Sequence, residues 1–402
     1  MPSIARPIAV VVAAGCLISL LTFGVRAGFG LFLGPMSAEM GWGRETFALA
    51  LAIQNLLWGL GQPFAGALAD RYGAGRVLAG GALLYAAGIA LMAEASSPLI
   101  FNLSAGVMVG LGLSGASFSV ALAAMTRMTP PSARGWVLGI GTAAGSLGQF
   151  LMVPLGQAFL AAYGWHTALF ILSALVLLAV PLAGVLRGRP DMGTGRQQSL
   201  GEALREAGGH RGYWLLLAGF FVCGFHVAFI QVHMPADLVD RGMAPTLGAW
   251  ALATVGLFNV AGAYSAGLMG ERFRKTGLLT AIYASRAVAI AAFVLLPLSP
   301  ATTLLFSAVM GLLWLSTVPL TSGAVAVIFG QRYLGMLFGI VFFSHQVGAF
   351  LGAWLGGVSY DMTGSYEIVW WLSVVLGVFA ALINWPIKVQ PVVRAPLTGA
   401  AG

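Results

Sequence analysis

The chain has 402 residues, of which 59% are hydrophobic and only 8% are charged. A soluble domain of this length does not need so much apolar surface, whereas a helical bundle that faces lipid does. The net charge of +8 is compatible with nucleic-acid binding, but the polar segments are only termini, short loops and one central stretch, which leaves no room for a DNA-binding module.

Twelve apolar runs follow one another along the chain, each of roughly 20 residues or more, which is enough to cross about 30 Å of hydrocarbon as a helix. The first run is too long for the core of a signal peptide, and no small-residue cleavage site follows it, so we expect it to remain as a helix. The sequence therefore predicts an all-α membrane protein with twelve transmembrane helices. The runs lie near residues 8–33, 46–69, 76–94, 99–125, 135–160, 165–186, 212–236, 247–270, 277–297, 301–328, 335–359 and 367–387.

Lys and Arg are distributed unequally between the two sides of these runs. Sixteen of the twenty fall on the side that carries both termini, whereas Arg44 and Arg241 fall on the other side and two lie inside runs. This asymmetry follows the positive-inside rule and predicts that both termini are cytoplasmic, in a multi-pass protein of the cytoplasmic (inner) membrane. The basic loops also favour contact with anionic lipid.

The most polar stretch separates the twelve runs into two sets of six. Its Gly, Gln and charged residues are typical of a cytoplasmic linker, with a short surface helix at residues 199–206. Identical residues recur across it at a spacing of 200, for example Gly148 and Gly348. We therefore expect two pseudo-repeated six-helix bundles with a substrate site near the midplane between them. The expected boundaries are 1–186 for the first bundle, 187–211 for the linker, 212–387 for the second bundle and 388–402 for a cytoplasmic tail.

A polar loop between the second and third runs reads Gly66-Ala-Leu-Ala-Asp70-Arg71-Tyr-Gly73-Ala-Gly-Arg76. It resembles the loop signature of the major facilitator superfamily, and a degenerate copy ending in Glu271-Arg272 occurs in the second half. The resemblance implies the major facilitator fold and secondary transport. We expect Asp70 to cap a helix N-terminus or to pair with an arginine of an adjacent cytoplasmic loop. The gating residues that the motif predicts are Gly66, Asp70, Arg71, Gly73, Arg76, Glu271 and Arg272.

Within that superfamily, the first and eleventh runs are similar to those of the monocarboxylate porters and the oxalate/formate antiporters. Arg26 falls where monocarboxylate porters place a substrate-linked Lys, and His345 aligns with a Lys that oxalate/formate antiporters use on their dianion. The eighth run departs from the pattern, because Asn259 and Ala263 stand where those families carry Asp and Arg. The missing cation favours a monocarboxylate over a dianion. Drug–proton antiporters are disfavoured, since Gly106 replaces the arginine of their fourth helix.

The ionisable side chains inside the apolar runs are basic, and none of the twelve acidic residues lies well inside a run. An ionisable group in hydrocarbon costs about 2.5–3.5 kcal/mol on insertion scales, so it indicates a pathway or a partner. Cations without buried carboxylates suggest that the missing anion is the substrate. The planar guanidinium of Arg26 can bind a carboxylate bidentately. The alternative is that Arg26 bonds backbone carbonyls near the outer end of its helix.

Helical spacing extends this candidate site. Ser19, Thr22, Arg26 and Gly30 share one face of the first helix and predict a polar stripe toward a wet cavity. His345 lies mid-helix and, because imidazole titrates near neutral pH, can carry a coupled proton. The alternative for His345 and His226 is a neutral ring bonded to a neighbouring helix. The predicted substrate-binding residues are Arg26, Asn55, His226, Asn259 and His345, with His226 and His345 as proton carriers.

Arg286 lies about ten residues into the ninth run, and ninth helices of this fold are usually peripheral. We therefore expect a structural role for it, bonded to carbonyls or to Tyr283 and Tyr264, in preference to substrate contact.

These features predict a secondary transporter of a small organic anion, a monocarboxylate, that works by alternating access in proton symport or anion exchange. One alternative is an exporter of a drug or another metabolite. Another is a transporter-like membrane regulator that affects expression of other genes indirectly. An enzyme is not expected, because the chain has no metal motif, catalytic triad, carboxylate pair or Walker A sequence. We expect no cofactor, no metal and no nucleic-acid partner, and a monomer surrounded by lipid.

Overall fold

The computed structural model of the chain describes residues 7–130, 133–187, 200–330 and 333–392. Within these ranges every regular element is a helix. The first half contains α1 (Ile8–Ala27), the 3-10 helix η1 (Phe29–Phe32), α2 (Leu33–Met40), α3 (Arg44–Tyr72), α4 (Ala74–Ala93), α5 (Pro98–Phe101), the π-helix η2 (Asn102–Met108), α6 (Val109–Gly115), α7 (Phe118–Arg127), α8 (Arg134–Leu177), α9 (Ala179–Ala183) and the 3-10 helix η4 (Gly184–Leu186). The second contains α10 (Leu200–Gly208), α11 (Arg211–Asp240), α12 (Pro245–Arg272), α13 (Lys275–Leu295), α14 (Pro300–Leu313), α15 (Thr317–Phe329), α16 (Leu334–Thr363) and α17 (Glu367–Asn384).

The prediction of twelve spanning helices is confirmed, although only ten helices of the described chain qualify by length and apolar composition alone. The segment Trp136–Leu186 counts as one, but Gly164 inside it has a φ of 74°, which glycine adopts readily, so the chain turns there and makes two spans. The helix α3 is less apolar because it carries Gln54, Asn55 and the motif charges. Its 29 residues are nevertheless long enough to cross a membrane.

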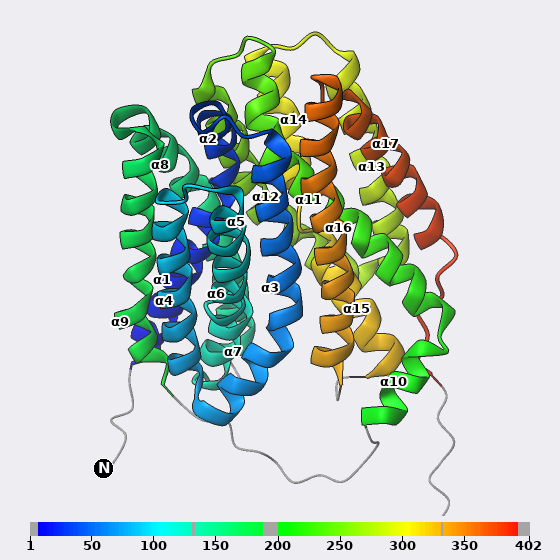
Figure 1. Cartoon of the computed structure of the whole chain (residues 1–402). Coiled ribbons are helices and arrows are strands. Elements are labelled where there is room, and N and C mark those ends of the chain that lie inside the picture. The colour runs from blue at the N-terminus through cyan, green and yellow to red at the C-terminus, as the bar shows by residue number, and fades with distance from the viewer. Residues whose placement is uncertain (1–6, 131–132, 188–199, 331–332, 393–402) are drawn as a thin grey trace, which may run out of the picture.

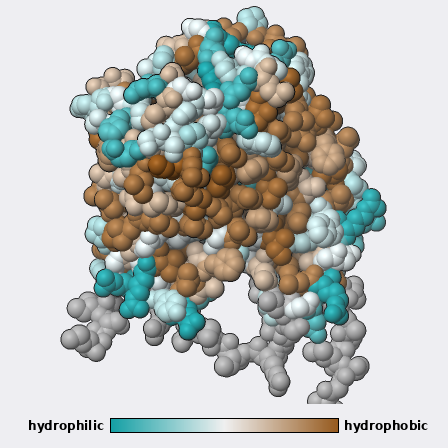
Figure 2. All heavy atoms as spheres, in the orientation of Figure 1, coloured by the Kyte–Doolittle hydropathy of each residue, from teal (hydrophilic) through white to brown (hydrophobic). Residues whose placement is uncertain are grey.

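The two halves stand side by side, and both described ends of the chain lie at the same end of the bundle (Figure 1). The helix α1 begins there, and the backbone N–H of Val392 donates to the carbonyl of Ile328 in the last turn of α15 at 2.9 Å. We call this end the terminal face and the other end the opposite face. Figure 2 shows a broad apolar band across the visible face of the bundle between two more polar ends, as a membrane-spanning protein requires.

The predicted linker at 187–211 lies largely outside the described residues, which resume at Leu200. The short helix expected at its end is present as α10. The expected tail at 388–402 is described as far as Val392. The domain boundaries therefore remain predictions.

Glycines bring paired helices into close contact at equivalent positions of the two halves. Gly148 of α8 lies against the backbone of Leu20 in α1, and Gly348 of α16 lies against the backbone of Phe221 in α11. A Cβ at either position would collide with that backbone, so no other residue fits without a shift of the helices. The spacing of 200 found in the sequence is thus a repeat of packing as well as of residues.

The fourth and tenth spans, each expected as one helix, are broken at equivalent places. The break follows Gly115 in the fourth span and Leu313 in the tenth. The side-chain oxygen of Ser117 caps the start of α7 after the first break. At the second break, Arg286 donates to the carbonyl of Leu313 at 2.6 Å. Broken helices are tolerated at membrane depth because neighbouring side chains satisfy the freed backbone groups in this way.

Candidate substrate site between the halves

Arg26 lies in the last turn of α1, and its side chain reaches residues of both halves. Its Nη2 group donates to Oδ1 of Asn55 in α3, and Nη1 donates to Oε1 of Gln231 in α11 at 3.2 Å. A cation is favourable at this place because the C-terminal end of a helix carries partial negative charge. The hydrogen-bond partners of Arg26 are therefore side-chain amides and not the backbone carbonyls that were the alternative.

Asn55 and Trp58, one turn apart on α3, contact Arg26 from within the first half. The Nδ2 group of Asn55 donates to the carbonyl of Leu51 at 2.8 Å, which leaves its oxygen directed at Arg26. The guanidinium carbon lies over the Trp58 ring, 4.7 Å from its centroid. A cation–π contact of this kind contributes about 0.5–1 kcal/mol at an exposed site and more where water is excluded.

Gln231 is a site residue that the helical pattern did not identify. The close approach of η1 and α11 places it beside Arg26, because Gly30 packs directly against the backbone of Gln231 and Val232. In the sequence, Gln231 lies between Ile230 and Val232. An amide between two β-branched apolar residues was the feature of the sequence that could have identified Gln231.

The second half contributes a run of side chains from α16. His345 and Gln346 share a hydrogen bond of 3.0 Å between Nδ1 and Oε1. The ring of Phe342 stacks on His345, with 5.8 Å between centroids and 7° between planes, and meets the ring of Trp58 edge-on at 5.6 Å. His345 is therefore connected to Arg26 through Phe342 and Trp58.

Four N–H groups around this centre are buried and have no acceptor in the described structure: Nε of Arg26, Nε1 of Trp58, Nε2 of Gln231 and Nε2 of Gln346. Buried donors are normally satisfied, so an unpaired group of this kind needs an explanation. The four ion pairs found among the described residues do not include Arg26. The side chains of Arg26 and Trp58 remain partly exposed, although these four N–H groups are buried. These donors lack a hydrogen-bond acceptor, and beside a guanidinium an anionic acceptor is the most favourable one.

Two residues predicted to bind substrate, Asn259 and His226, are hydrogen-bonded to other parts of the protein. Asn259 donates to Oγ of Ser146 at 2.8 Å and accepts from the backbone N–H of Leu315 at 2.9 Å, so it joins the two halves behind the centre. His226 is fully buried, and its Nε2 shares a 2.8 Å hydrogen bond with the carbonyl of Ser373 in α17. Neither residue is in hydrogen-bond contact with Arg26.

The polar stripe predicted on the first helix does not face water as a whole. Ser19 and Thr22 are buried, and their hydroxyls donate to the carbonyls of Gly15 and Ile18 one turn earlier in α1. Neighbouring helices enclose this part of α1, since α8 packs along it and the hydroxyl of Tyr85 in α4 donates to the carbonyl of Thr22 at 3.2 Å. Of the stripe, Arg26 alone presents charge to the space between the halves.

Arg286 makes the carbonyl contacts expected of it, to Leu313 and Trp314 at the break in the tenth span. Its guanidinium carbon also lies 5.5 Å from the centroid of the Tyr283 ring. The other expected partner, Tyr264, is 68% exposed and takes no part, because it points away from the bundle. Arg286 itself is fully buried, so it does not line the central space.

The loop motif forms a local ion pair at the terminal face. Nη1 of Arg127, the last residue of α7, donates to Oδ1 of Asp70 at 2.8 Å, which is the kind of pairing expected for Asp70. Gly73 has a φ of 93° and ends α3, so it performs the turn that a residue with a side chain would strain. The guanidinium carbon of Arg71 lies 5.2 Å from the centroid of the Tyr72 ring, and neither Arg71 nor Arg76 is part of the four ion pairs among the described residues.

The degenerate copy in the second half is built differently. Glu271 and Arg272 are exposed at the end of α12, and position 328, which matches Arg127 in the repeat, is an isoleucine. Instead, Nζ of Lys275 donates to the carbonyl of Gly270 at 2.8 Å. The predicted gating role of all seven motif residues stays a prediction.

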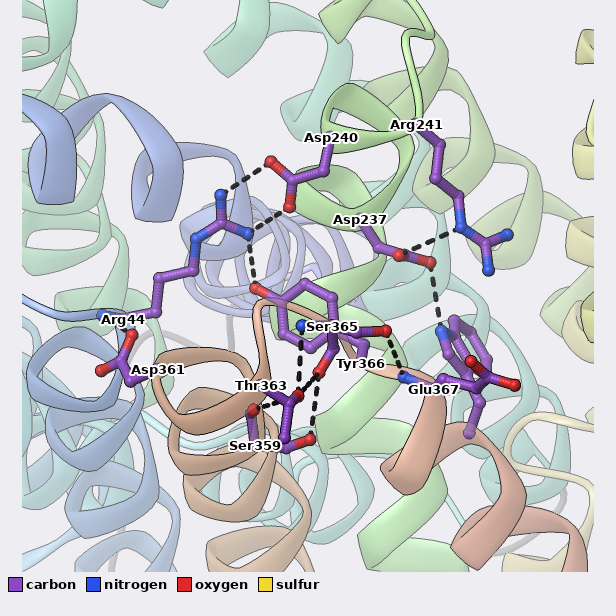
Figure 3. Close-up of polar contacts among 11 residues, drawn as sticks. Arg44, Asp237, Asp240, Arg241, Ser359, Asp361, Thr363, Ser365, Tyr366 and Glu367 are labelled. Atoms are coloured by element: carbon purple, nitrogen blue, oxygen red, sulfur yellow. Dashed lines mark hydrogen bonds and ion pairs between the residues drawn. The ribbon is translucent and has the colours of Figure 1, made fainter.

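The strongest polar contact between the halves lies at the opposite face, among residues that the sequence did not single out (Figure 3). Arg44, at the start of α3, forms two hydrogen bonds with the carboxylate of Asp240 in α11, at 2.5 and 2.8 Å. It also donates to the hydroxyl of Tyr366 at 2.8 Å and lies over the ring of Tyr360 at 3.6 Å. We call Arg44, Asp240, Asp361 and Tyr366 the latch.

Asp361 completes the latch by capping a helix of the other half. Its two carboxylate oxygens accept from the backbone N–H groups of Arg44 and Glu45, both at 2.9 Å, at the positive N-terminal end of α3. Burial raises the pKa of Tyr366, which Arg44 partly offsets, so the phenol stays neutral and remains a hydrogen-bond acceptor for Arg44. The only available signal in the sequence was that Arg44 is one of the few cations on this side.

The fold therefore defines a multi-pass helical membrane protein whose two six-helix halves meet around a cationic centre. The family model of the Major Facilitator Superfamily matches residues 15–311, and the chain belongs to that superfamily of transporters.

Relatives and solved structures agree with this assignment. The chain is 26% identical over 378 residues to the uncharacterized MFS-type transporter YcxA of Bacillus subtilis, covering 89% of this chain and 90% of that protein. It is 28% identical to monocarboxylate transporter 13 of Rattus norvegicus over 87% of this chain and 81% of that protein. It is equally 28% identical to the multidrug resistance protein MdtH of Edwardsiella ictaluri, over 88% of each. The fold matches a bacterial homologue of the human lysosomal transporter Spinster with a TM-score of 0.75 at 18% identity, over 94% of this chain and 96% of that one.

Proposed function

We propose that this transporter carries a small organic anion, a monocarboxylate, and that Arg26 binds the carboxylate. The observation that supports this most directly is the cluster of four unpaired N–H groups around a guanidinium that has no carboxylate partner among the described residues. Hydrogen bonds from a cation to a carboxylate are about twice as strong as neutral ones, so an anion would meet this requirement better than water. The similarity to a monocarboxylate transporter points in the same direction.

Substrate binding would act directly on a contact between the halves. Arg26 in α1 and Gln231 in α11 belong to different halves and are hydrogen-bonded to each other without substrate. A carboxylate that binds across Nη1 and Nη2 displaces the oxygen of Gln231 and turns that amide so that its N–H can donate to the substrate. The anion then replaces the bond from the guanidinium to a neutral amide of the other half by two bonds to a carboxylate, which changes the relative stability of the two access states.

The latch gives these states their structural difference. It joins the halves at the opposite face, whereas at the terminal face α7 and α15 pack mainly on helices of their own halves. The protein would release substrate toward the terminal face in this form and must open the latch to reach the other form. With both termini cytoplasmic, as the charge distribution predicts, this form faces the cytoplasm. We propose a monomer in the inner membrane as the working unit.

His345 is the better of the two proposed proton carriers. Its ring is linked by hydrogen bond to Gln346, one of the residues with an unpaired donor, whereas His226 faces α17. Asn259 supports the site by joining α12, α8 and the break in the tenth span, and Asn55 orients Arg26. Anion exchange requires neither histidine, so the coupling is tested by the same assay as the substrate.

Uptake into proteoliposomes tests the proposal. We expect saturable flux of at least one labelled carboxylate from a panel that runs from formate, acetate, lactate and pyruvate to oxalate and benzoate. Arg26→Ala should reduce it about a hundredfold, since removal of a buried charged partner costs roughly 2–5 kcal/mol. Arg205→Ala in α10, which also removes one cation, serves as the matched control and should leave flux unchanged.

A dependence of the flux on an imposed proton gradient would indicate symport, and flux that needs only an anion on the other side would indicate exchange. If folded wild-type protein carries no acid of the panel, the anion proposal is wrong. Export of a neutral or cationic compound by the same protein would then identify the alternative, a drug or metabolite exporter, for which the similarity to MdtH is the supporting observation.

A further inference from the structure

The side chains between Arg26 and the centre of α16 form a continuous series of aromatic rings. The Arg26 guanidinium lies over Trp58 at 4.7 Å, Trp58 meets Phe342 at 5.6 Å, and Phe342 stacks on His345 at 5.8 Å. The series ends on Phe220 of α11, whose centroid is 5.0 Å from that of His345. It crosses from the first half to the second, because Trp58 belongs to α3 and Phe342 to α16.

From this series we infer that the substrate is a monocarboxylate with an aromatic ring, which places its carboxylate on Arg26 and its ring against Trp58 and Phe342. The inference rests on the proposed function, in which Arg26 binds a carboxylate. Arg26 covers one face of Trp58 and His345 stacks on one face of Phe342, but both side chains remain partly exposed, so a third ring would contact the exposed part of this edge-on pair. A third ring can stack there with the offset or edge-on geometry that aromatic groups prefer.

The surrounding residues disfavour other classes of organic anion. A dicarboxylate requires a second cation across the site, but Arg286 is fully buried against the carbonyls of Leu313 and Trp314. A polyhydroxylated acid requires paired donors and acceptors along its length, whereas the unpaired groups of Trp58 and Gln346 are donors only. Aromatic rings opposite one cation fit a substrate that is charged at one end and flat and apolar at the other.

Competition between matched acids tests the inference in the proteoliposome assay. We use benzoate, cyclohexanecarboxylate, acetate and phthalate, which share a carboxylate and differ in ring, planarity or charge. Benzoate should bind about twofold to thirteenfold more tightly than cyclohexanecarboxylate, because stacking between aromatic rings adds to the burial of the same area by about 0.5–1.5 kcal/mol. Acetate and phthalate should compete weakly.

Variants of the rings separate recognition from packing. Trp58→Leu and Phe342→Leu should each weaken benzoate about fivefold to tenfold more than they weaken acetate, whereas Trp58→Phe and Phe342→Tyr keep a ring and should retain the preference. Trp136→Leu, at a residue of α8 that is 56% exposed on the outside of the bundle, is the control for loss of an indole. If the leucine variants fail to fold, the affinities of the wild type, Trp58→Phe and Phe342→Tyr for the four acids still test the inference.

The outcomes are distinguishable. Equal affinity for benzoate and cyclohexanecarboxylate, together with uptake that requires Arg26, would refute the aromatic substrate and leave the carboxylate proposal intact. Tighter binding of acetate or phthalate than benzoate would refute it as well. Absence of Arg26-dependent binding of every acid would refute both. Preference for benzoate that is lost in the leucine variants and kept in the phenylalanine and tyrosine variants supports it.

Discussion

The two halves have the same backbone plan but carry their cations on different helices. Arg26 in the first helix of the first half corresponds, at the spacing of 200, to His226 in the first helix of the second. In the third helix it is the second half that carries the arginine, since Arg286 corresponds to Tyr85 of the first half at a spacing of 201. Arg26 faces the space between the halves. Arg286, in the ninth span, is instead hydrogen-bonded to the break in the tenth span of the same half.

This difference shows how a repeat can keep its packing while its chemistry diverges. The glycines that bring α1 to α8 and α11 to α16 are retained at matching positions, because a side chain there would separate the helices. The polar residues between them are free to change. The first half therefore supplies the cation and the indole of the centre, and the second half supplies two amides, an imidazole and a phenyl ring.

The largest effect expected from this comparison concerns the two arginines. Arg286→Met should lower the free energy of unfolding by about 2–4 kcal/mol, because it removes the guanidinium from the carbonyls of Leu313 and Trp314, at roughly 1–3 kcal/mol each, and leaves Trp314 only the weak donor Cys223. Arg26→Met should affect stability much less, because water can reach its partly exposed site, while it removes substrate binding. Thermal unfolding in detergent and substrate affinity, measured on both variants, provide the comparison.

The reverse result would break the comparison. If Arg286→Met were as stable as the wild type but lost substrate affinity, the second half would provide a substrate cation after all. If Arg26→Met were the less stable of the two, its side chain would serve chiefly to join the halves.

The latch is expected to give an intermediate effect. Its charges are also divided unequally, with the cation Arg44 from the first half and the carboxylates Asp240 and Asp361 from the second. Arg44→Gln should shift the protein toward the form that is open at the opposite face by about 1–2 kcal/mol, since the pair is bidentate and largely shielded. Labelling of a cysteine introduced at Ala48, which is buried beneath the latch beside Gly357, should then become several-fold faster.

The exposed pair at the terminal face provides the control for the latch. Asp70 and Arg127 lie within one half, with side chains 56% and 34% exposed, so Asp70→Asn should change the labelling little. Faster labelling in Asp70→Asn than in Arg44→Gln would mean that the loop motif, rather than the latch, holds the opposite face closed.

The smallest effect is expected at the turns that end the second helix of each half. Gly73 has a φ of 93°, so Gly73→Ala should cost about 1–2 kcal/mol of stability. Gly66→Ala places its Cβ in open space inside the same helix and should be neutral or slightly stabilising, by up to about 1 kcal/mol. The second half turns at Phe273 with a φ of −114°, so alanine is expected to be tolerated there. Unfolding midpoints of the three variants check this order, which equal midpoints would contradict.

The fold could be predicted almost completely from hydropathy and repeat spacing. A bilayer fixes how many apolar residues a spanning helix needs, so run length alone identifies most spans. The breaks after Gly115 and Leu313 could not be found in this way, because run length and mean hydropathy do not locate a break inside a run, and the breaks depend on partners such as Arg286 that are distant in the sequence.

The candidate site could be predicted in part. Arg26 and Asn55 were identified because charge and amide groups are conspicuous in an apolar helix, and the structure places them in contact. Gln231, Trp58 and Phe342 acquire their place only from the contact of the halves, and His226 points to α17 although its sequence environment resembles that of a cavity residue.

The sequence by itself therefore determined the number of spans, their division into halves and the presence of intramembrane cations without buried carboxylates, since these depend on composition and local spacing. The tertiary structure alone decided which faces of the helices meet. Arg26 and Gln231 are 205 residues apart, and Arg44 and Asp240 are 196 apart. The rotation of each helix about its axis depends on close glycine contacts such as that of Gly30 with α11, and no local pattern specifies such contacts.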